Sequence, residues 1–154
     1  YLIEAFNSLS LKNAELWMVG NDLKKFASIL KLDTNKNIKF FGSLNHLVIN
    51  DYYKKSSIFC LPSFDEGFPI VIPQAMTFGL PIITSQTGND VIQNFFNGFI
   101  VDPGSTSQLA KYIKYLYDNP EKLKLMANNA IISHDQFFSP KKYTDTVLST
   151  ILKV

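Results

Sequence analysis

The sequence predicts an α/β protein in which helices flank a layered, parallel β-sheet. Short apolar stretches of strand length alternate with longer segments whose apolar residues recur every three or four positions, as on one face of a helix. Several short stretches end at a glycine or a polar loop, where a chain passes from a strand to a helix. The chain has 154 residues, 46% of them hydrophobic, which is enough for one well-filled core and too little for two ordinary domains. We therefore expect a single domain across residues 1–154.

In the first half of the chain, apolar spacing and capping residues define each predicted element. The apolar residues of segment 2–9 share one helical face. Gly20 and Gly42 close two compact apolar strands, and Asn21 or Asp22 is a suitable cap for the helix between them. In chain order we expect a helix at 2–9, a strand at 16–19, a helix from the cap to about Leu32, a strand at 38–41, a helix at 44–54 and a buried strand at 57–61.

In the second half, Ser105 or Thr106 is the expected start of a helix, and Pro120 suits the first position of the next helix because that position needs no N–H donor. In chain order we expect a helix at 70–78, a strand at 81–85, a hairpin-like segment at 98–101, a helix from 105 or 106, a helix from 120 and a last helix at 140–152. A parallel unit of this class normally opens with a strand. This chain opens within a helix, so we expect that its first strand is absent.

Composition argues against several classes of function. The net charge is +2, and all 15 basic residues are lysines, so the chain lacks the arginines and the marked basic excess that nucleic-acid recognition favours. His46 and His134 show no metal-ligand spacing, and we expect no metal. Cys60 lies in an apolar run and is predicted to be a buried structural thiol in a reducing compartment. Residues 67–89 are uncharged, but their prolines and glycines indicate a helix, a turn and a strand, not a membrane span.

The segment 61–76 is the expected binding site. A buried strand leads into a polar loop, and a helix begins almost at once. In open α/β sheets, ligands bind outside the carboxyl ends of the strands, and a helix start offers unpaired N–H groups to a diphosphate. Glu66 is placed to accept hydrogen bonds from sugar hydroxyls, and Gly67 lets the backbone approach a ligand. The local chemistry equally allows Asp65 and Glu66 to be acids favoured near a helix dipole.

This segment resembles the signature of the glycosyl transferases group 1 family, whose members are retaining enzymes with the GT-B fold. The signature has a glutamate, Gly-Phe-Gly or Gly-Phe-Pro, and a second glutamate after seven intervening residues, followed by Ala-Met. Here the matching residues are Glu66-Gly67-Phe68-Pro69 and Gln74-Ala75-Met76. The resemblance extends in order along nearly the whole chain. It includes the stretches at 18–20, 40–42, 58–63, 79–83 and 97–104.

The resemblance implies that residues 1–154 form a Rossmann-like, C-terminal, nucleotide-sugar-binding domain whose N-terminal acceptor-binding domain is absent. The implied activity is the retaining transfer of a hexose-type sugar from a nucleotide-diphosphate sugar to a glycan or lipid-linked acceptor, as in capsule or lipopolysaccharide assembly. No cofactor or metal is implied. The implied location is the cytoplasm, with peripheral attachment to the inner face of the membrane through the missing domain.

The resemblance also implies a role for each matching residue. Glu66, assigned as the catalytic residue, and the N–H of Phe68 hold donor-sugar hydroxyls, beside Gly67. The N–H of Ile70 meets the diphosphate, and Gln74 stands where the second glutamate of the family grips the ribose. Main-chain atoms near Leu44 face the nucleobase.

Two departures from the family pattern affect these expectations. Gln74 is neutral and keeps only the hydrogen-bonding part of a charged grip, which indicates a weakened or altered nucleotide contact. The basic pair that clasps the diphosphate would precede residue 1, so we expect the fragment alone to be inactive and to bind donor weakly. Two alternatives stay open: a non-catalytic nucleotide-sugar-binding module and, less favoured, a dinucleotide-binding oxidoreductase domain. The latter needs a Gly-x-Gly-x-x-Gly turn, which the sequence lacks.

Overall fold

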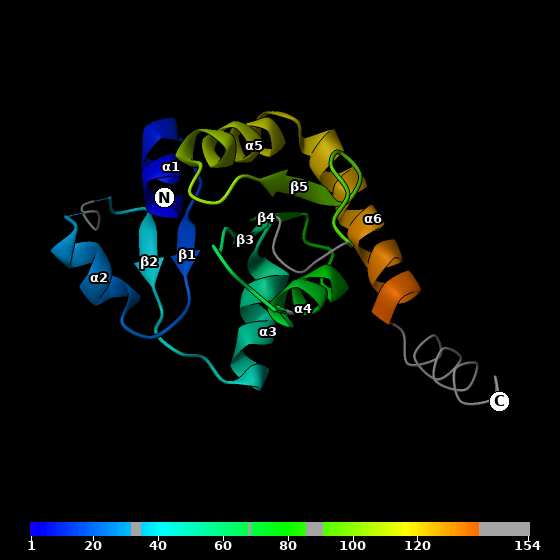
Figure 1. Ribbon diagram of the computed structural model, residues 1–154, viewed down its shortest axis with the longest axis horizontal. Helices are drawn as coiled ribbons and strands as arrows, with labels where there is room; N and C mark the ends of the chain where they lie inside the picture. The colour runs from blue at the N-terminus through cyan, green and yellow to red at the C-terminus, as the bar shows by residue number, and fades with distance from the viewer. Residues whose placement is uncertain (32–34, 68, 86–90, 139–154) are drawn as a thin grey trace.

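The computed structural model describes residues 1–31, 35–67, 69–85 and 91–138, and it has the predicted α/β architecture. Helices and strands alternate along most of the chain, and two helices end the described part (Figure 1). The elements are α1 (Leu2–Leu9), β1 (Leu16–Met18), α2 (Leu23–Ile29), β2 (Ile38–Phe40), α3 (His46–Lys55), β3 (Phe59–Leu61), α4 (Val71–Thr77), β4 (Ile82–Ser85), β5 (Gly98–Val101), α5 (Thr106–Asp118) and α6 (Pro120–Phe138).

The strands form two parallel sheets. β1 pairs with β2, and β4 lies between β3 and β5 in a three-stranded sheet. The prediction of a hairpin-like segment at 98–101 is wrong, because β5 runs parallel to β4, with Ile82 opposite Gly98 and Ser85 opposite Val101. A parallel neighbour requires the chain to return to the starting edge of the sheet before it enters β5. Residues 91–97 make part of that return.

Asn97 and Gly98 fix the entry into β5. The Asn97 side chain is fully buried, and its amide nitrogen donates to the carbonyl oxygen of Val91 (2.9 Å) and to Ser133 Oγ (2.8 Å). Its Oδ1 accepts from the backbone N–H of Gln93 (2.8 Å), so both ends of the amide are satisfied inside the protein. At Gly98, an added Cβ would lie only 2.1 Å from the carbonyl oxygen of Ile82. Only glycine allows β5 to lie this close to β4.

Alternation along β4 divides the main core into two layers. Ile82 faces a cluster built on α3, α4 and α6, and Ile83 faces a cluster built on α1, α5 and α6. Successive side chains of a strand point to opposite faces, so a sheet covered by helices on both faces has an apolar strand at its centre. All four residues of β4 are buried accordingly. A third cluster joins α1 and α2 to β2.

Helix boundaries follow the predicted caps with three differences. Ser105 caps α5 and Pro120 begins α6, as predicted. Helix α2 ends at Ile29, earlier than predicted, and the side chain of Asp22 forms no capping hydrogen bond. Helix α3 begins at His46, and the sequence prediction overlooked Asn45, whose Oδ1 accepts from the N–H groups of the second and third helical residues. The predicted last helix at 140–152 lies outside the described residues.

Candidate functional site

The loop that follows β3 is fixed to the end of the neighbouring strand. Ser85, the last residue of β4, donates its hydroxyl to the carbonyl oxygen of Ser63. One residue earlier, the Thr84 hydroxyl donates to the carbonyl oxygen of Leu61 (2.9 Å). The Thr84 bond reinforces the last pair of the β3–β4 register, and the Ser85 bond continues the association of the two segments beyond that pair. The loop that carries the predicted site therefore begins from a defined position at the carboxyl end of the sheet.

Glu66 is held within this loop by Ser63. The Ser63 hydroxyl donates to Glu66 Oε1 at 2.8 Å, and the Glu66 side chain is half-buried. The carboxylate is therefore partly accessible to solvent, and the hydrogen bond from Ser63 restricts its rotation. A carboxylate has about four acceptor positions, so those that Ser63 leaves unused can accept hydrogen bonds from a ligand. Ser63 belongs to the stretch 58–63 that resembles the family, but the sequence did not indicate that it would hold Glu66.

Helix α4 begins at Val71, shortly after Glu66 in the chain, with Ile70 at its N-cap position. The N–H of Ile72 donates to the carbonyl oxygen of Pro69 (2.9 Å), so this group is not available to a ligand. Within the described part of the chain, the N–H groups of Ile70 and Val71 donate no hydrogen bond. The Ile70 side chain is 63% exposed. Ile70 therefore has a backbone N–H group without a partner among the described residues, at an exposed helix start.

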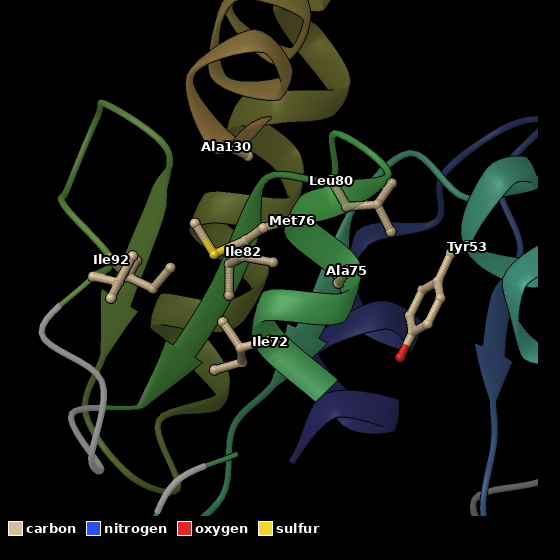
Figure 2. Close-up of a cluster of buried hydrophobic side chains, with 9 residues drawn as sticks. Tyr53, Ile72, Ala75, Met76, Leu80, Ile82, Ile92 and Ala130 are labelled. Atoms are coloured by element: carbon tan, nitrogen blue, oxygen red, sulfur yellow. The ribbon is translucent and has the colours of Figure 1, made fainter. Parts of the chain in front are cut away.

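The opposite side of α4 anchors it in the core. Ile72, Ala75 and Met76 are fully buried and pack with Ile82 of β4 and Ala130 of α6 (Figure 2). This packing holds the helix start in place at the edge of the sheet without support from a ligand. A site on such an anchored element needs little ordering when a ligand binds.

Phe64 and Gly67 shape the rest of the loop. The Phe64 ring is 61% exposed, and its edge meets the Tyr1 ring with centroids 5.6 Å apart. A Cβ at Gly104, in the loop after β5, would lie 3.2 Å from the Phe64 ring, so the loops after β3 and β5 are adjacent. At Gly67, an added Cβ would have no heavy atom within 4 Å. The protein itself therefore does not require glycine at position 67.

The other predicted residues are distributed between two loops and one helix. Gln74 is half-buried on α4, one turn beyond Ile70, and its N–H donates to the Ile70 carbonyl oxygen (3.2 Å). Leu44 is half-buried in the loop between β2 and α3, which belongs to the two-stranded sheet. Glu66, Gly67, Ile70 and Gln74 thus belong to one loop and the helix that follows it, and Leu44 comes from a separate loop. Phe68 lies outside the described residues.

A cavity of about 360 Å³ lies elsewhere, beside the edge strand β2. Lys24 of α2 and residues 35, 36 and 38–41, in and next to β2, supply its lining, and none of the predicted site residues belongs to it. Geometry and chemistry favour the loop before α4 as the candidate site, because that loop combines a restrained carboxylate with open backbone donors. In the described ranges, no cluster of three histidine, cysteine or carboxylate residues could hold a metal. Cys60 is half-buried, less enclosed than predicted, and the burial of its thiol raises the pKa to about 12.

Known proteins match the chain over most of its length. The family described as glycosyl transferases group 1 matches residues 1–132. A protein from Haemophilus influenzae named as an uncharacterized glycosyltransferase is 30% identical over 144 residues, which are 88% of this chain and 40% of that protein. The UDP-Gal:alpha-D-GlcNAc-diphosphoundecaprenol alpha-1,3-galactosyltransferase of Escherichia coli is 31% identical over 71% of this chain and 28% of its own length.

Solved structures show the same fold. HepE of Anabaena in complex with UDP superimposes with a TM-score of 0.87 at 22% identity, over 99% of this chain and 44% of that one. The same protein in complex with UDP-glucose gives a TM-score of 0.82 over the same fractions of both chains. The chain thus spans less than half the length of each of these proteins.

Proposed function

The chain belongs to the glycosyl transferases group 1 family, and on that premise we propose that it binds the donor substrate of a sugar-transfer reaction. The proposed reaction moves a hexose-type sugar, with retention of anomeric configuration, from a nucleotide-diphosphate sugar to a glycan or lipid-linked acceptor. The observation that carries the proposal is that one short segment contains both a carboxylate, Glu66, held by Ser63, and an N–H group, that of Ile70, without a partner among the described residues. The carboxylate can accept hydrogen bonds from sugar hydroxyls, and the N–H group can donate to a diphosphate oxygen.

Each group acts by positioning or by stabilising charge. The Glu66 carboxylate accepts hydrogen bonds from hydroxyls of the donor sugar, and each such bond to a charged group contributes about 1.5–3 kcal/mol. Ser63 orients the carboxylate before the donor arrives. The N–H of Ile70 faces the charge that grows on the leaving diphosphate as the glycosidic bond breaks, so its contribution is larger in the transition state than in the ground state. The absence of a side chain at Gly67 lets donor and backbone approach closely.

The remaining proposed contacts concern the nucleotide. Gln74 hydrogen-bonds the ribose with a neutral amide, and main-chain atoms near Leu44 face the base. The backbone N–H of Phe68 is proposed to meet the donor sugar. HepE, which shares the fold, is solved with UDP and with UDP-glucose, and the E. coli relative is named for a UDP-galactose donor. These names support a nucleoside diphosphate hexose as the donor class.

We also propose that residues 1–154 are the C-terminal part of a longer enzyme. A strand before Tyr1 would lie between β1 and β3, pair with both, and join the two parallel sheets into one. In the described chain β1 pairs only with β2, and β3 pairs only with β4. Figure 1 shows β1 on the side of its sheet that faces β3. A basic residue pair for the diphosphate would lie on this strand and in the loop that follows it, and an acceptor-binding domain would precede the strand.

Three further features of the enzyme are proposals of the same kind. The reaction needs no bound metal, because fixed backbone donors and the basic pair would balance the diphosphate charge. The enzyme works in the cytoplasm, where its nucleotide-sugar donors are made. The acceptor, of the kind used in capsule or lipopolysaccharide assembly, meets the enzyme at the inner face of the membrane through the N-terminal domain. No helix among the described residues has the length and apolar character to cross a membrane.

One specific residue favours a second function, in which the chain binds nucleotide sugars without catalysing transfer. Gln74 replaces a charged residue of the family signature, which weakens the expected grip on the ribose. A module of this kind would still show saturable binding of UDP or GDP sugars but no transfer when joined to its N-terminal domain. Titration calorimetry and a transfer assay on the same preparation separate the two functions.

The test of the main proposal is a Glu66→Gln substitution in the full-length enzyme, with Asp65→Asn as the matched control. Glutamine keeps the shape and removes the charge. Loss of one charged hydrogen bond of about 1.5–3 kcal/mol corresponds to a fall in kcat/KM of roughly 10- to 150-fold. Asp65 is exposed and should tolerate the same change. Equal activity of the Glu66→Gln variant and the unchanged enzyme would remove the proposed role of Glu66.

A further inference from the structure

Phe95 has a backbone conformation that suits glycine, and its ring faces solvent. Its φ is +63°, in the left-handed region, where a bulky side chain is an outlier. Glycine adopts this conformation without a steric cost. The Phe95 side chain is 62% exposed, so most of its ring gains nothing from burial in the core. A strained residue with an exposed aromatic ring indicates a function for that ring.

Hydrogen bonds hold the turn around Phe95 in this conformation. The N–H of Phe95 donates to the carbonyl oxygen of Gly98 (3.1 Å). The side chain of Asn94 accepts through Oδ1 from the N–H of Ile100 in β5 (2.8 Å). Strain at one residue persists only where the surrounding structure fixes the backbone. The turn therefore holds the Phe95 ring at a defined place, next to the amino end of β5.

Phe95 contacts three other aromatic rings. Its ring centroid lies 5.1 Å from that of Phe99, 6.4 Å from that of Tyr112 and 6.0 Å from that of Tyr115, and in each pair the rings meet edge to face. Phe99 is fully buried and stacks on Tyr112 at 4.1 Å, which joins the group to the core. Tyr112 and Tyr115 are half-buried and lie one turn apart on α5. We call the surface formed by Phe95, Tyr112 and Tyr115 the Phe95 platform.

The Phe95 platform combines aromatic carbon with unused hydrogen-bonding groups. In the described part of the chain, the hydroxyl groups of Tyr112 and Tyr115 form no hydrogen bond, whereas that of Tyr117 donates to the carbonyl oxygen of Lys12 (2.7 Å). The Lys111 ammonium lies 5.3 Å from the centre of the Tyr112 ring and forms no salt bridge among the described residues. An apolar stacking surface is thus bordered by hydroxyl and ammonium groups.

We infer that the Phe95 platform binds a carbohydrate chain. The C–H groups on one face of a hexose ring form a flat apolar surface, and the electron-rich face of an aromatic ring attracts such weakly positive hydrogens. The hydroxyl groups at the rim of the sugar need hydrogen-bond partners. Phe95 supplies the stacking ring, and Tyr112, Tyr115 and Lys111 supply the polar groups. Neither kind of contact requires a charge on the sugar, so the ligand class is a neutral hexose oligosaccharide.

The size of the Phe95 platform suits a sugar chain better than a second protein. A phenylalanine side chain has an area of roughly 200 Å², so at 62% exposure Phe95 offers about 120 Å². A stable protein interface needs about 800 Å² from each partner. Two half-buried tyrosines do not supply the difference. A hexose ring is similar in size to an aromatic ring, so a few sugar units cover the platform.

The rest of the longer enzyme is not placed to cover Phe95. The strand proposed before Tyr1 would lie beside β3, and β4 separates β3 from β5. The acceptor-binding domain would face the carboxyl ends of the strands, where the loop with Glu66 lies, whereas Phe95 precedes the amino end of β5. The described chain ends at Phe138, at the end of α6 that points away from α5 (Figure 1).

This inference is independent of the proposed donor site. The Phe95 platform belongs to α5 and the turn before β5, whereas Glu66 belongs to the loop after β3. A second surface that holds a glycan would keep a growing sugar chain near the enzyme between transfers. Loss of sugar transfer would leave oligosaccharide binding at the platform unchanged, and loss of the platform would leave donor binding unchanged.

NMR titration of the unchanged chain, labelled with nitrogen-15, tests the inference. The probes are maltohexaose, cellohexaose and chitohexaose, which are neutral chains that differ in linkage or substituents. At least one of them should shift the amide signals of residues 94–96 and 111–115 in a saturable manner. Added salt should not weaken this binding, because the sugar carries no charge. The Glu66→Gln variant should bind the same oligosaccharide with equal affinity.

Three variants locate the binding surface. Phe95→Gly removes the ring and relieves the backbone, so it should weaken binding about tenfold or more with little change in Tm. Phe26→Ala on α2, where Phe26 is 60% exposed, is the matched control and should bind as before. Tyr115→Phe removes only a hydroxyl group, so it should keep the fold and weaken binding about threefold, and it decides the case if Phe95→Gly unfolds.

Three outcomes would overturn the inference. The first is the lack of a saturable shift with any of the three oligosaccharides. The second is a set of shifts confined to residues 61–76, which would place the sugar at the donor loop. The third is unchanged affinity in the Phe95→Gly variant or, if that variant unfolds, in the Tyr115→Phe variant.

Discussion

Replacement of Gly98 by alanine should disrupt the pairing of β4 and β5. The new Cβ would lie 2.1 Å from the carbonyl oxygen of Ile82 and 3.0 Å from its carbonyl carbon. Close carbon–oxygen contacts between strands are about 3.3 Å, so the two strands would have to separate by about 1.2 Å. The atoms in conflict are backbone on both sides, and no side-chain rotation can relieve the contact.

The size of the effect follows from what this separation disturbs. Ile82, Ile83 and Phe99 are fully buried around the β4–β5 pair, so the core layers on both faces of the sheet would open. Overpacking costs about 1–3 kcal/mol, and each weakened ladder hydrogen bond adds about 1 kcal/mol. We expect a loss of about 4 kcal/mol in the free energy of unfolding. For a chain of this size that corresponds to a fall in Tm of about 12 °C.

Urea denaturation followed by far-ultraviolet circular dichroism measures this loss as a lower midpoint with an unchanged slope. Gly67→Ala is the matched control, because a Cβ at position 67 would have no heavy atom within 4 Å. The control should unfold within about 0.5 kcal/mol of the unchanged chain, as surface substitutions usually do. An unchanged midpoint in the Gly98→Ala variant would refute the close approach of β5 to β4.

Three further predictions concern a buried amide, a buried thiol and the site glycine. Asn97→Ala removes three hydrogen bonds, two of them buried, and should cost about 3 kcal/mol in a urea titration, and a loss below about 1 kcal/mol would show that water replaces them. The pKa of Cys60 is raised by burial from 9.0 to about 12, so the stability linked to its protonated thiol is complete below the unfolded value and is lost as the pH rises toward 12. Between these pH values the unchanged chain should lose up to about 4 kcal/mol more than a Cys60→Ala variant, and parallel pH profiles would contradict the burial of the thiol. In the full-length enzyme, Gly67→Ala should weaken donor binding about tenfold or more in titration calorimetry, at a cost of about 1.4 kcal/mol, while equal affinity would mean that the donor does not approach this backbone.

The sequence predicts the elements of this fold well where the signal is local. The apolar spacing of α1 and α5, the cap at Ser105 and the proline at position 120 depend only on neighbouring residues, and the structure confirms them. The direction of β5 depends on distant contacts. Residues 98–101 have the same apolar character in a hairpin and in a parallel strand, and only the burial of Asn97 and the contact of Gly98 with β4 determine the pairing.

The candidate site was predictable in part for the same reason. The motif places Glu66, Gly67 and Ile70 on one loop and helix start, and the structure has α4 begin at Val71, directly after Ile70. Their roles in donor binding stay predictions. Two features could not be predicted, because side-chain hydrogen bonds made by loop residues leave no periodic pattern in a sequence. Ser63 restrains Glu66, and Ser85 ties the loop to β4. One sequence signal could have indicated both features. Ser63 comes just after the carboxyl end of one buried strand, and Ser85 is the last residue of the next one.

The most direct test of the account is a structure of the full-length enzyme with an intact nucleotide-sugar donor. The account predicts the Glu66 carboxylate within hydrogen-bonding distance of a sugar hydroxyl and the N–H of Ile70 on the diphosphate, with Ser63 still donating to Glu66. A donor bound in the cavity beside β2, or a diphosphate held without α4, would contradict the assignment of this loop as the sugar site.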